Sequence, residues 1–388
     1  MEKLKTKIMR HLKAFCFLFV VTVLFWNCGN HKQNVTNFQN DSIMIKDSQS
    51  QMGKTFLPPL ENGEIHLTDD AFGSTINLKG FPLKFKEIIK PEQLLVKGRY
   101  LIINNQREDS IFMIFELPGL KCIAAFGIRG RGPDEFSFPR IVETAEDSIL
   151  FYIYEMSNEK LYKVSINKLS PEYYLTLPKG NRSFDDKQIA FTDAGTAYYT
   201  ASTDNGKMIF CFNKDSLPQV RKFKDLSISG IKGSWTTFIG DFGINKDLGR
   251  IAYAYKYFKR LRVLDMQTMN EKNIIFDARE LAKGQNDIET LEPTNITHFW
   301  GMSPKEKYFW MLYSGRTPVE VQRDNRNNDK YIFVEQYDWN GNPVKRYKLD
   351  DWGYFCVDEK NKTIYLASTA SIYSILKYNI PDSINLNY

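Results

Sequence analysis

Between Glu64 and the end of the chain, hydrophobic residues come in short runs that are rich in β-branched and aromatic side chains. Gly, Asn, Asp and Pro residues separate these runs at short intervals. This pattern is typical of β-strands joined by turns, and no long stretch has the spacing of an amphipathic helix. The pattern therefore predicts an all-β fold for residues 64–388.

Two short patterns recur along this region. Successive copies of the first pattern lie 48 to 58 residues apart. It consists of a turn residue, one further residue and an apolar or aromatic run, with its third residue at Tyr100, Ile149, Ala197, Ile251, Phe309 and Ile364. The second is an apolar run that ends in an acid or amide before a turn, at Glu116, Asn167, Asn213, Asp265, Asp338 and Asn379. Repeats of about 40–50 residues with four strands each are typical of propeller blades, so the sequence predicts a six-bladed β-propeller.

The sixth repeat has only three predicted strands before the chain ends. We expect its outermost strand to come from the N-terminal segment 64–89, in which residues 74–78 have a strand-like sequence. Such a strand closes the ring and removes exposed sheet edges. In the fifth repeat, the polar residues 316–330 are predicted to form an insertion.

The first 27 residues have the features of a secretory signal. Five basic residues and one acid precede an apolar run of thirteen residues, 14–26. As a helix this run is roughly 20 Å long, too short for a hydrocarbon core of about 30 Å. Residues 1–27 are therefore predicted to be a signal peptide rather than a permanent transmembrane helix.

Cys28 follows the apolar run directly, and the junction resembles the lipobox of bacterial lipoproteins. The match is loose, because Phe25 stands where Leu is usual and Asn27 stands where a small residue is usual. Lipidation of Cys28 is the favoured prediction, and an ordinary signal peptide with an incidental Cys is the alternative. The polar residues that follow predict a disordered tether over residues 28–63.

Cleavage before Cys28 would remove most of the net positive charge of the chain. The full chain carries a formal charge of +6, but the mature chain has 47 basic and 45 acidic residues. A net charge of +2 gives no reason to expect nucleic-acid binding. We expect a monomer that contacts the membrane through its lipid.

The longest loops are predicted on one face of the propeller, where connections between blades and between second and third strands meet. Arg129, Arg131, Asp134 and Glu135 lie in one such loop, which also contains three glycines. Internal pairing of these arginines with Asp134 or Glu135, which would join one blade to the next, is the favoured interpretation. Binding of a carboxylate or phosphate is the alternative, and it makes these four residues candidate binding residues. Two further candidate binding residues are expected on the same face, Arg260 and Arg316.

Signals for catalysis are weak. The chain has four His and five Cys residues, and no hydrolase or metalloprotease motif occurs in it. His298 is predicted to be a packed residue of an inner strand, and most aromatic residues are predicted to pack between blades. Asp241 is a candidate Ca²⁺ ligand in the channel, but one carboxylate falls far short of a site. We therefore predict no catalytic residues, no metal site and no cofactor.

Three stretches resemble the TolB-like six-bladed propeller lipoproteins of Bacteroidetes: residues 126–136, 250–258 and 337–344. The resemblance implies a propeller fold and a lipid-anchored location in the cell envelope, at the outer membrane, and it supplies no catalytic residues. Exposure to the periplasm or the cell surface stays open, as does O-glycosylation of Ser42.

We thus expect a non-catalytic module that binds a protein, peptide or glycan of the envelope. The alternative function is that of a propeller hydrolase or lyase with Ca²⁺ in its channel.

Overall fold

The computed structural model describes residues 57, 60–87, 89–105, 107, 109–132, 135–179, 187–192, 195–204, 206–216, 219–233, 236–290, 292–369 and 374–381. The chain divides into two units, residues 1–52 and 53–388, and all described residues belong to the second unit. The predicted signal peptide, Cys28 and Ser42 lie outside the described residues.

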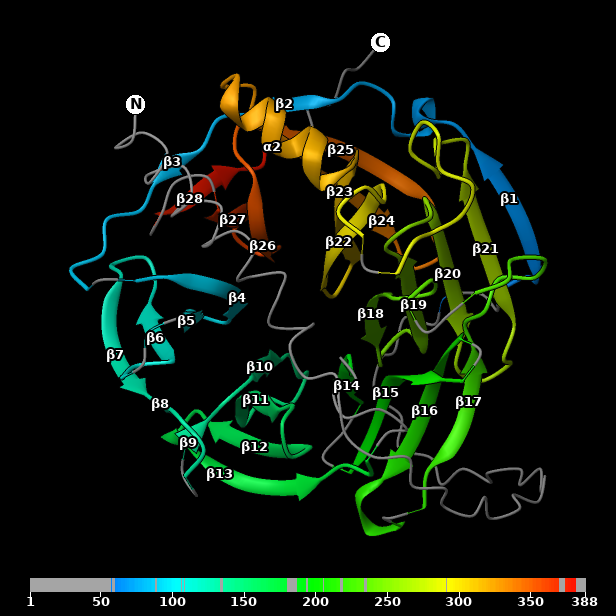
Figure 1. Cartoon of the computed structure of the whole chain (residues 1–388). Helices are drawn as coiled ribbons and strands as arrows, with labels where there is room; N and C mark the ends of the chain where they lie inside the picture. Colours follow the sequence, from blue (N-terminus) through cyan, green and yellow to red (C-terminus); the bar gives the residue numbers. More distant parts are fainter. Residues whose placement is uncertain are drawn as a thin grey trace, which may run out of the picture. The chain divides into compact units, whose positions relative to one another are not determined.

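The second unit forms a ring of six antiparallel sheets, as predicted (Figure 1). Blade 1 consists of β4 (Pro91–Lys97), β5 (Tyr100–Asn105), β6 (Phe112–Glu116) and β7 (Lys121–Phe126). Blade 2 consists of β10 (Pro139–Val142), β11 (Ile149–Glu155), β12 (Lys160–Ser165) and β13 (Lys168–Thr176). Blade 3 consists of β14 (Ile189–Phe191), β15 (Thr196–Thr203), β16 (Gly206–Asn213) and β17 (Arg221–Asp225).

The second half of the ring has the same order of strands from the inside outward. Blade 4 consists of β18 (Gly240–Asn245), β19 (Arg250–Tyr255), β20 (Arg260–Asp265) and β21 (Glu271–Phe276). Blade 5 consists of β22 (Thr297–Pro304), β23 (Tyr308–Arg316), β24 (Ile332–Asp338) and β25 (Pro343–Leu349). Blade 6 begins with β26 (Gly353–Asp358), β27 (Thr363–Ser368) and β28 (Ser374–Asn379).

Both sequence patterns mark strands at fixed places in the blade. Each of the six positions of the first pattern is the first or second residue of a second strand. The second pattern ends at the last residue of the third strand in five blades, and Asn167 follows β12 by two residues. The repeat in the sequence is therefore the repeat of the fold.

The N-terminal segment closes the ring, but residues 74–78 do not supply the closing strand. That role belongs to β3 (Phe81–Pro82), which pairs with β28. The predicted strand corresponds to β2 (Ile76–Leu78), which instead adds a parallel fifth strand to blade 5. Likewise, β1 (Gly63–Leu67) adds a parallel fifth strand to blade 4.

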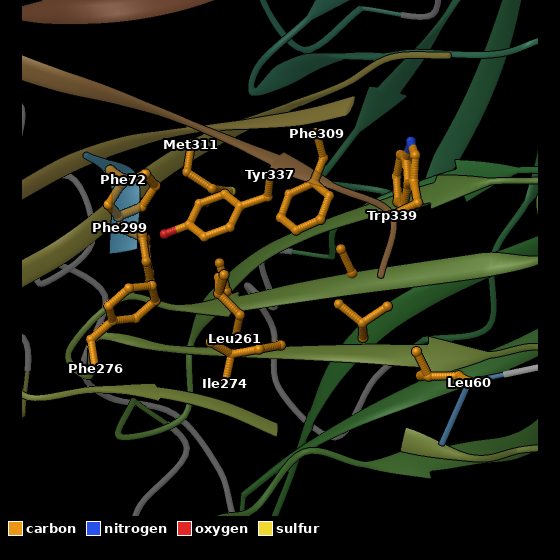
Figure 2. Packing of buried hydrophobic residues seen from close by; sticks show 13 residues of the cluster. Leu60, Phe72, Leu261, Ile274, Phe276, Phe299, Phe309, Met311, Tyr337 and Trp339 are labelled. Atoms are coloured by element: carbon orange, nitrogen blue, oxygen red, sulfur yellow. The ribbon is translucent and has the colours of Figure 1, made fainter. Parts of the chain in front are cut away.

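We call residues 60–82 the strap, because this segment runs along the outer strands of three blades (Figure 1). It begins at Leu60, four residues before the predicted start of the propeller. Leu60 and Phe72 are buried in a core cluster between blades 4 and 5 (Figure 2). Phe72 stacks on Phe276 of β21, with 5.8 Å between the ring centroids. The strap thus buries two apolar side chains in this cluster, and Leu67, Ile76 and Leu78 are partly buried against the core.

Aromatic residues fill the seams between blades, as the sequence predicted. Tyr198, Tyr253, Tyr365 and Trp310 are all buried. In the seam between blades 4 and 5, Phe309 stacks on Tyr337 with 5.2 Å between centroids (Figure 2). Such pairs add stabilisation beyond the burial of their surface.

The polar insertion of blade 5 contains a helix, α2 (Pro318–Arg326), that hydrophobic spacing does not predict. Thr317 Oγ1 accepts a hydrogen bond from the backbone N–H of Glu320, whose carboxylate accepts from the backbone N–H of Thr317. This reciprocal capping box, with Pro318 in the first turn, starts the helix at Thr317. Other short elements are η1 (Asp69–Phe72), η2 (Lys214–Ser216), β8 (Ile128–Arg129) and β9 (Glu135–Phe136).

Candidate functional site

The long connections gather at one end of the ring, as predicted. The links between blades and between second and third strands both lie there, and we call this end the crossover face. Its long connections include residues 127–138, 226–239, 277–296 and 317–331. Long loops on a rigid scaffold are the usual place for binding residues, so the search for a site begins here.

The loop between blades 1 and 2 is ordered by hydrogen bonds of its own. Arg129 donates from Nη1 to the backbone oxygen of Ser137 at 3.0 Å. Glu135 Oε2 accepts from the backbone N–H of Gly132 at 2.8 Å. A side chain at Gly130 would place its Cβ only 1.9 Å from Glu135 Oε2, so it would displace this carboxylate from its hydrogen bond with Gly132.

A buried carboxylate fastens the same loop to blade 2. Glu155, the last residue of β11, accepts hydrogen bonds from the backbone N–H groups of Ser137 and Phe138 at 2.9 and 3.1 Å. Ionised acceptors make strong hydrogen bonds, and Glu155 therefore fixes the end of the loop where β10 begins.

Neither predicted pairing of arginine with Glu135 is present. Glu135 bonds to backbone, and Arg129 bonds to a backbone oxygen. Arg131 is exposed and has no ion pair or hydrogen bond to another described residue. Asp134 lies outside the described residues. Arg129 therefore helps to order the loop, and Arg131 is exposed on it, as are Ile128 and Phe138.

Arg260 and Arg316 both have partners inside the protein. Arg260 pairs with Glu280 at 3.0 Å and so ties a hairpin of blade 4 to the connection that follows it. Arg316 pairs with Asp324 of α2 at 3.0 Å, and its guanidinium lies 3.8 Å from the ring centroid of Tyr331. The predicted binding residues thus lie at three separate places on the crossover face. Arg279 pairs with Glu320 at 3.0 Å and joins the connection that carries Glu280 to α2.

A different set of residues gathers at the inner edge of the ring. Trp300 lies on β22, Tyr354 lies on β26 and Trp352 directly precedes β26. The Trp300 ring is 5.7 Å from Trp352 and 5.8 Å from Tyr354, measured between centroids. We call these three residues the inner-edge trio. All three are partly exposed, unlike the buried Trp310 and Trp339 in the seams.

Charged side chains surround the trio. Lys256, in the hairpin of blade 4, places its ammonium 4.6 Å from the centroid of the Trp300 ring. Burial raises the pKa of Tyr354, while the positive charge of Arg140 lowers it and the negative charge of Glu92 raises it. Arg140 and Glu92 come from the innermost strands β10 and β4. Aromatic rings of blades 5 and 6 thus lie near charged side chains from blades 1, 2 and 4.

Sequence reasoning assigned the aromatic residues to packing and therefore missed the trio. The available signal was positional, because Trp300 and Tyr354 both fall in the first strand of a repeat, whereas the packing residues fall in the second. The first strand of each blade lies next to the axis of the ring. Its side chains can therefore face the central channel instead of filling the seam between two blades.

Within the part of the chain that the structure describes, no three His, Cys, Asp or Glu side chains lie close enough together to hold a metal ion. Asp241 lies on β18, at the inner edge, as predicted. His298 is a buried residue of β22 whose ring stacks on Tyr313. Burial, and then the positive charge of Lys259, lowers the pKa of His298 to about 3. Cys122, Cys211 and Cys356 are free thiols in different blades.

The architecture is that of a six-bladed β-propeller with its partly exposed polar and aromatic residues at the inner edge. The chain belongs to the TolB-like 6-blade propeller-like family, whose sequence model matches residues 71–360. A comparison with curated proteins found no match.

The solved structures that are similar to this chain include two proteins of Bacteroides species. A putative exported protein of Bacteroides fragilis is similar over 82% of this chain and 99% of its own, with 12% identity and a TM-score of 0.52. A member of the DUF4221 family from Bacteroides vulgatus is similar over 79% of this chain and 96% of its own, with 9% identity and a TM-score of 0.49. At such low identity, these similarities concern the fold alone.

Proposed function

We propose that this protein is a non-catalytic binding module of the bacterial cell envelope, held to the outer membrane by a lipid on Cys28. Its ligand is a protein, peptide or glycan of the envelope, which the propeller binds at the crossover face. The observation that carries the proposal is the inner-edge trio, Trp300, Trp352 and Tyr354, which is partly exposed at the inner edge of the ring.

The trio has the properties of a contact surface. Trp and Tyr rings provide a large contact area and lose little conformational entropy on binding. Nearby Lys256, Arg140 and Glu92 supply charges of both signs for orienting a ligand. The surrounding loops differ in length from blade to blade, so the crossover face is asymmetric.

The binding test compares variants of partly exposed aromatic residues. Purified protein carrying Trp300→Ala or Trp352→Ala is tested against three separate fractions: solubilised envelope proteins, peptides derived from them, and released glycans. Tyr173→Ala is the matched control, because Tyr173 is an exposed ring on the outer strand β13, far from the inner edge.

We expect one fraction to be retained by the wild-type protein and by Tyr173→Ala, with at least a tenfold loss of affinity in both tryptophan variants. Equal retention by all variants, or retention of no fraction, would contradict the proposed site. Elemental analysis of the purified protein tests the absence of catalysis, since stoichiometric Ca²⁺ bound at the inner edge would favour a hydrolase or lyase instead.

The anchor is supported by the sequence of residues 1–28 and is tested separately. No helix among the described residues is long and apolar enough to cross a bilayer. Replacement of Cys28 by Ala should move the protein from the membrane fraction to the soluble fraction, because several acyl chains supply stable anchoring. Unchanged membrane retention of Cys28→Ala would refute lipid attachment at this residue.

A further inference from the structure

Four charged side chains meet in the seam between blades 4 and 5. Lys259 precedes β20, Glu335 lies on β24, Arg346 lies on β25, and Asp69 comes from η1 of the strap. The side chains of Lys259 and Glu335 are fully buried, and that of Arg346 is 8% exposed. The Asp69 side chain is 51% exposed, so it is the one member that water reaches freely.

Asp69 completes a balanced arrangement of two cations and two anions. Its Oδ1 accepts hydrogen bonds from Lys259 Nζ at 2.5 Å and from Arg346 Nη2 at 2.8 Å. Glu335 Oε1 lies 2.8 Å from Arg346 and 3.3 Å from Lys259. Without Asp69, two buried cations would share one anion, and an uncompensated buried charge is costly.

Residues of the ring hold the two cations in place from the other sides. Lys259 Nζ lies 3.9 Å from the ring centroid of Tyr313 and 4.6 Å from that of Phe276. Tyr337 donates a hydrogen bond to Glu335 Oε2 at 2.5 Å, which fixes the carboxylate between the cations. Apart from Asp69, every group named here belongs to blades 4 and 5, so the ring itself presents two oriented cations to the strap.

The strap that carries Asp69 is held by few buried groups. In β1 four of the five residues are exposed, β2 has three residues and β3 has two. Among the described strap residues, Leu60 and Phe72 are the buried hydrophobic ones. A pocket of about 440 Å³ opens beside β1, lined in part by Leu60, Lys272 and Asn342. Elements with so few buried contacts are the ones that open locally.

Asp69 is ionised at neutral pH. Burial alone would raise the pKa of Asp69, but hydrogen bonds from Arg346 and Lys259 lower it to about 2. The group that reaches the two cations is therefore a carboxylate and not a carboxylic acid.

We propose that Lys259 and Arg346 form a carboxylate-binding site of the propeller, and that Asp69 occupies it as part of residues 60–78 of the strap, which detach while β3 and the ring stay folded. The ligand class is a carboxylate on an extended segment that adds parallel strands to β21 and β25. In the closed form this segment is the chain's own residues 60–78. The site lies apart from the inner-edge trio, so the two proposals stand or fall separately.

The test removes the carboxylate and then returns it in solution. Full-length protein with Asp69→Ala is compared with wild type and with Asp70→Ala, the neighbouring acid of η1 that takes no part in the cluster. Thermal unfolding and hydrogen exchange are measured in sodium acetate and in sodium chloride at equal ionic strength. Asp69→Asn serves as a milder variant if Asp69→Ala fails to fold.

We expect Asp69→Ala to speed hydrogen exchange in residues 63–67 and 76–78 at least tenfold, with unchanged exchange in β11 and β15. Acetate should restore part of the protection where chloride does not, and Lys259→Met in the same protein should abolish that rescue. Asp70→Ala should behave as wild type.

Three results would overturn the proposal. The first is unchanged strap protection in Asp69→Ala, and the second is equal rescue by acetate and chloride. The third is faster exchange of β11 and β15 together with the strap, which would mean that the strap opens only when the ring unfolds.

Discussion

The outer edges of blades 4 to 6 are paired with strands of the strap, whereas those of blades 1 to 3 are not paired with any described strand. In blades 4 and 5 the strap adds a fifth strand, and in blade 6 it supplies the fourth. Blades 1 to 3 end at β7, β13 and β17, and no described strand pairs with their outer edges. An uncovered edge is a template for aggregation unless the protein blunts it.

Basic residues on outer strands serve opposite purposes in the two halves. On β17, Arg221 and Lys222 are exposed, where their charges discourage the approach of another strand. On β25, Arg346 is buried and binds Asp69 of the strap. A basic residue on an outer strand thus repels a further strand in one half and recruits an acidic one in the other.

Both halves also bury a lysine, again with different partners. Lys187, just before β14, pairs with Glu159 of blade 2 at 2.6 Å, and both side chains are buried. That pair lies wholly within the ring. Lys259 shares two carboxylates, one of which belongs to the strap. The buried charge of Lys259 is therefore compensated in part by a residue of the strap.

The largest expected effect comes from removing either buried lysine. Lys259→Met and Lys187→Met should each lower the free energy of unfolding by about 3–5 kcal/mol, because each removes a buried cation from a buried carboxylate. Lys259→Met leaves Glu335 and Asp69 to share Arg346, and Lys187→Met removes the cation that pairs with Glu159. Urea denaturation measures this loss. Limited proteolysis should distinguish the two variants. Residues 60–82 should be cleaved earlier than in wild type in Lys259→Met, but not in Lys187→Met. Equal cleavage of the strap in both variants would break the comparison.

The next largest effect is expected from Phe72→Ala, which should lower the free energy of unfolding far more than Phe81→Ala does. Phe72 is buried against Phe276, and its replacement by Ala should cost about 3 kcal/mol through lost burial and the cavity left behind. Phe81 is 56% exposed, and Phe81→Ala should change the free energy of unfolding by less than about 0.5 kcal/mol. Comparable losses for the two variants would mean that the strap is not held chiefly at the seam of blades 4 and 5.

A smaller effect is expected in the pH dependence of stability, and its source is His298, which stacks on Tyr313 beside Lys259. Its pKa in the folded protein is about 3, against an ordinary 6.5, so the unfolded chain binds the extra proton as the pH falls below 6.5. Stability from the neutral ring is therefore present above pH 6.5 and declines by about 1.4 kcal/mol per pH unit below it. His298→Phe should flatten this part of the pH profile, and an unchanged slope would show that other groups cause it.

The repetitive parts of the fold were predictable, because each repeat carries the same local pattern. Residues such as Ile251 and Asp265 mark strand ends through turns that lie within a few residues of them. The strap was predictable only in part, since the sequence of residues 74–78 indicates a strand but not which of three edges it joins. The helix α2 was missed because its signal is the cap formed by Thr317 and Glu320, not a hydrophobic face.

The charged cluster could not be found from sequence spacing at all. Asp69 is 190 residues from Lys259 and 277 from Arg346, and the ring closure alone brings them together. The ion pairs of two candidate arginines could not be found from spacing either, since Arg260 pairs with Glu280 of the following connection and Arg316 pairs with Asp324 of a helix that was not predicted. Exposure, which singles out Arg131 and the inner-edge trio, depends on the completed ring.

Native-state hydrogen exchange of the full-length wild-type protein at neutral pH tests the central comparison most directly. If the strap is a separately held segment, amides of β1 and β2 should exchange together and well before those of β20 and β24, which lie one strand further inside blades 4 and 5. Exchange of the strap at the same rate as these strands would show a single cooperative unit and contradict the account.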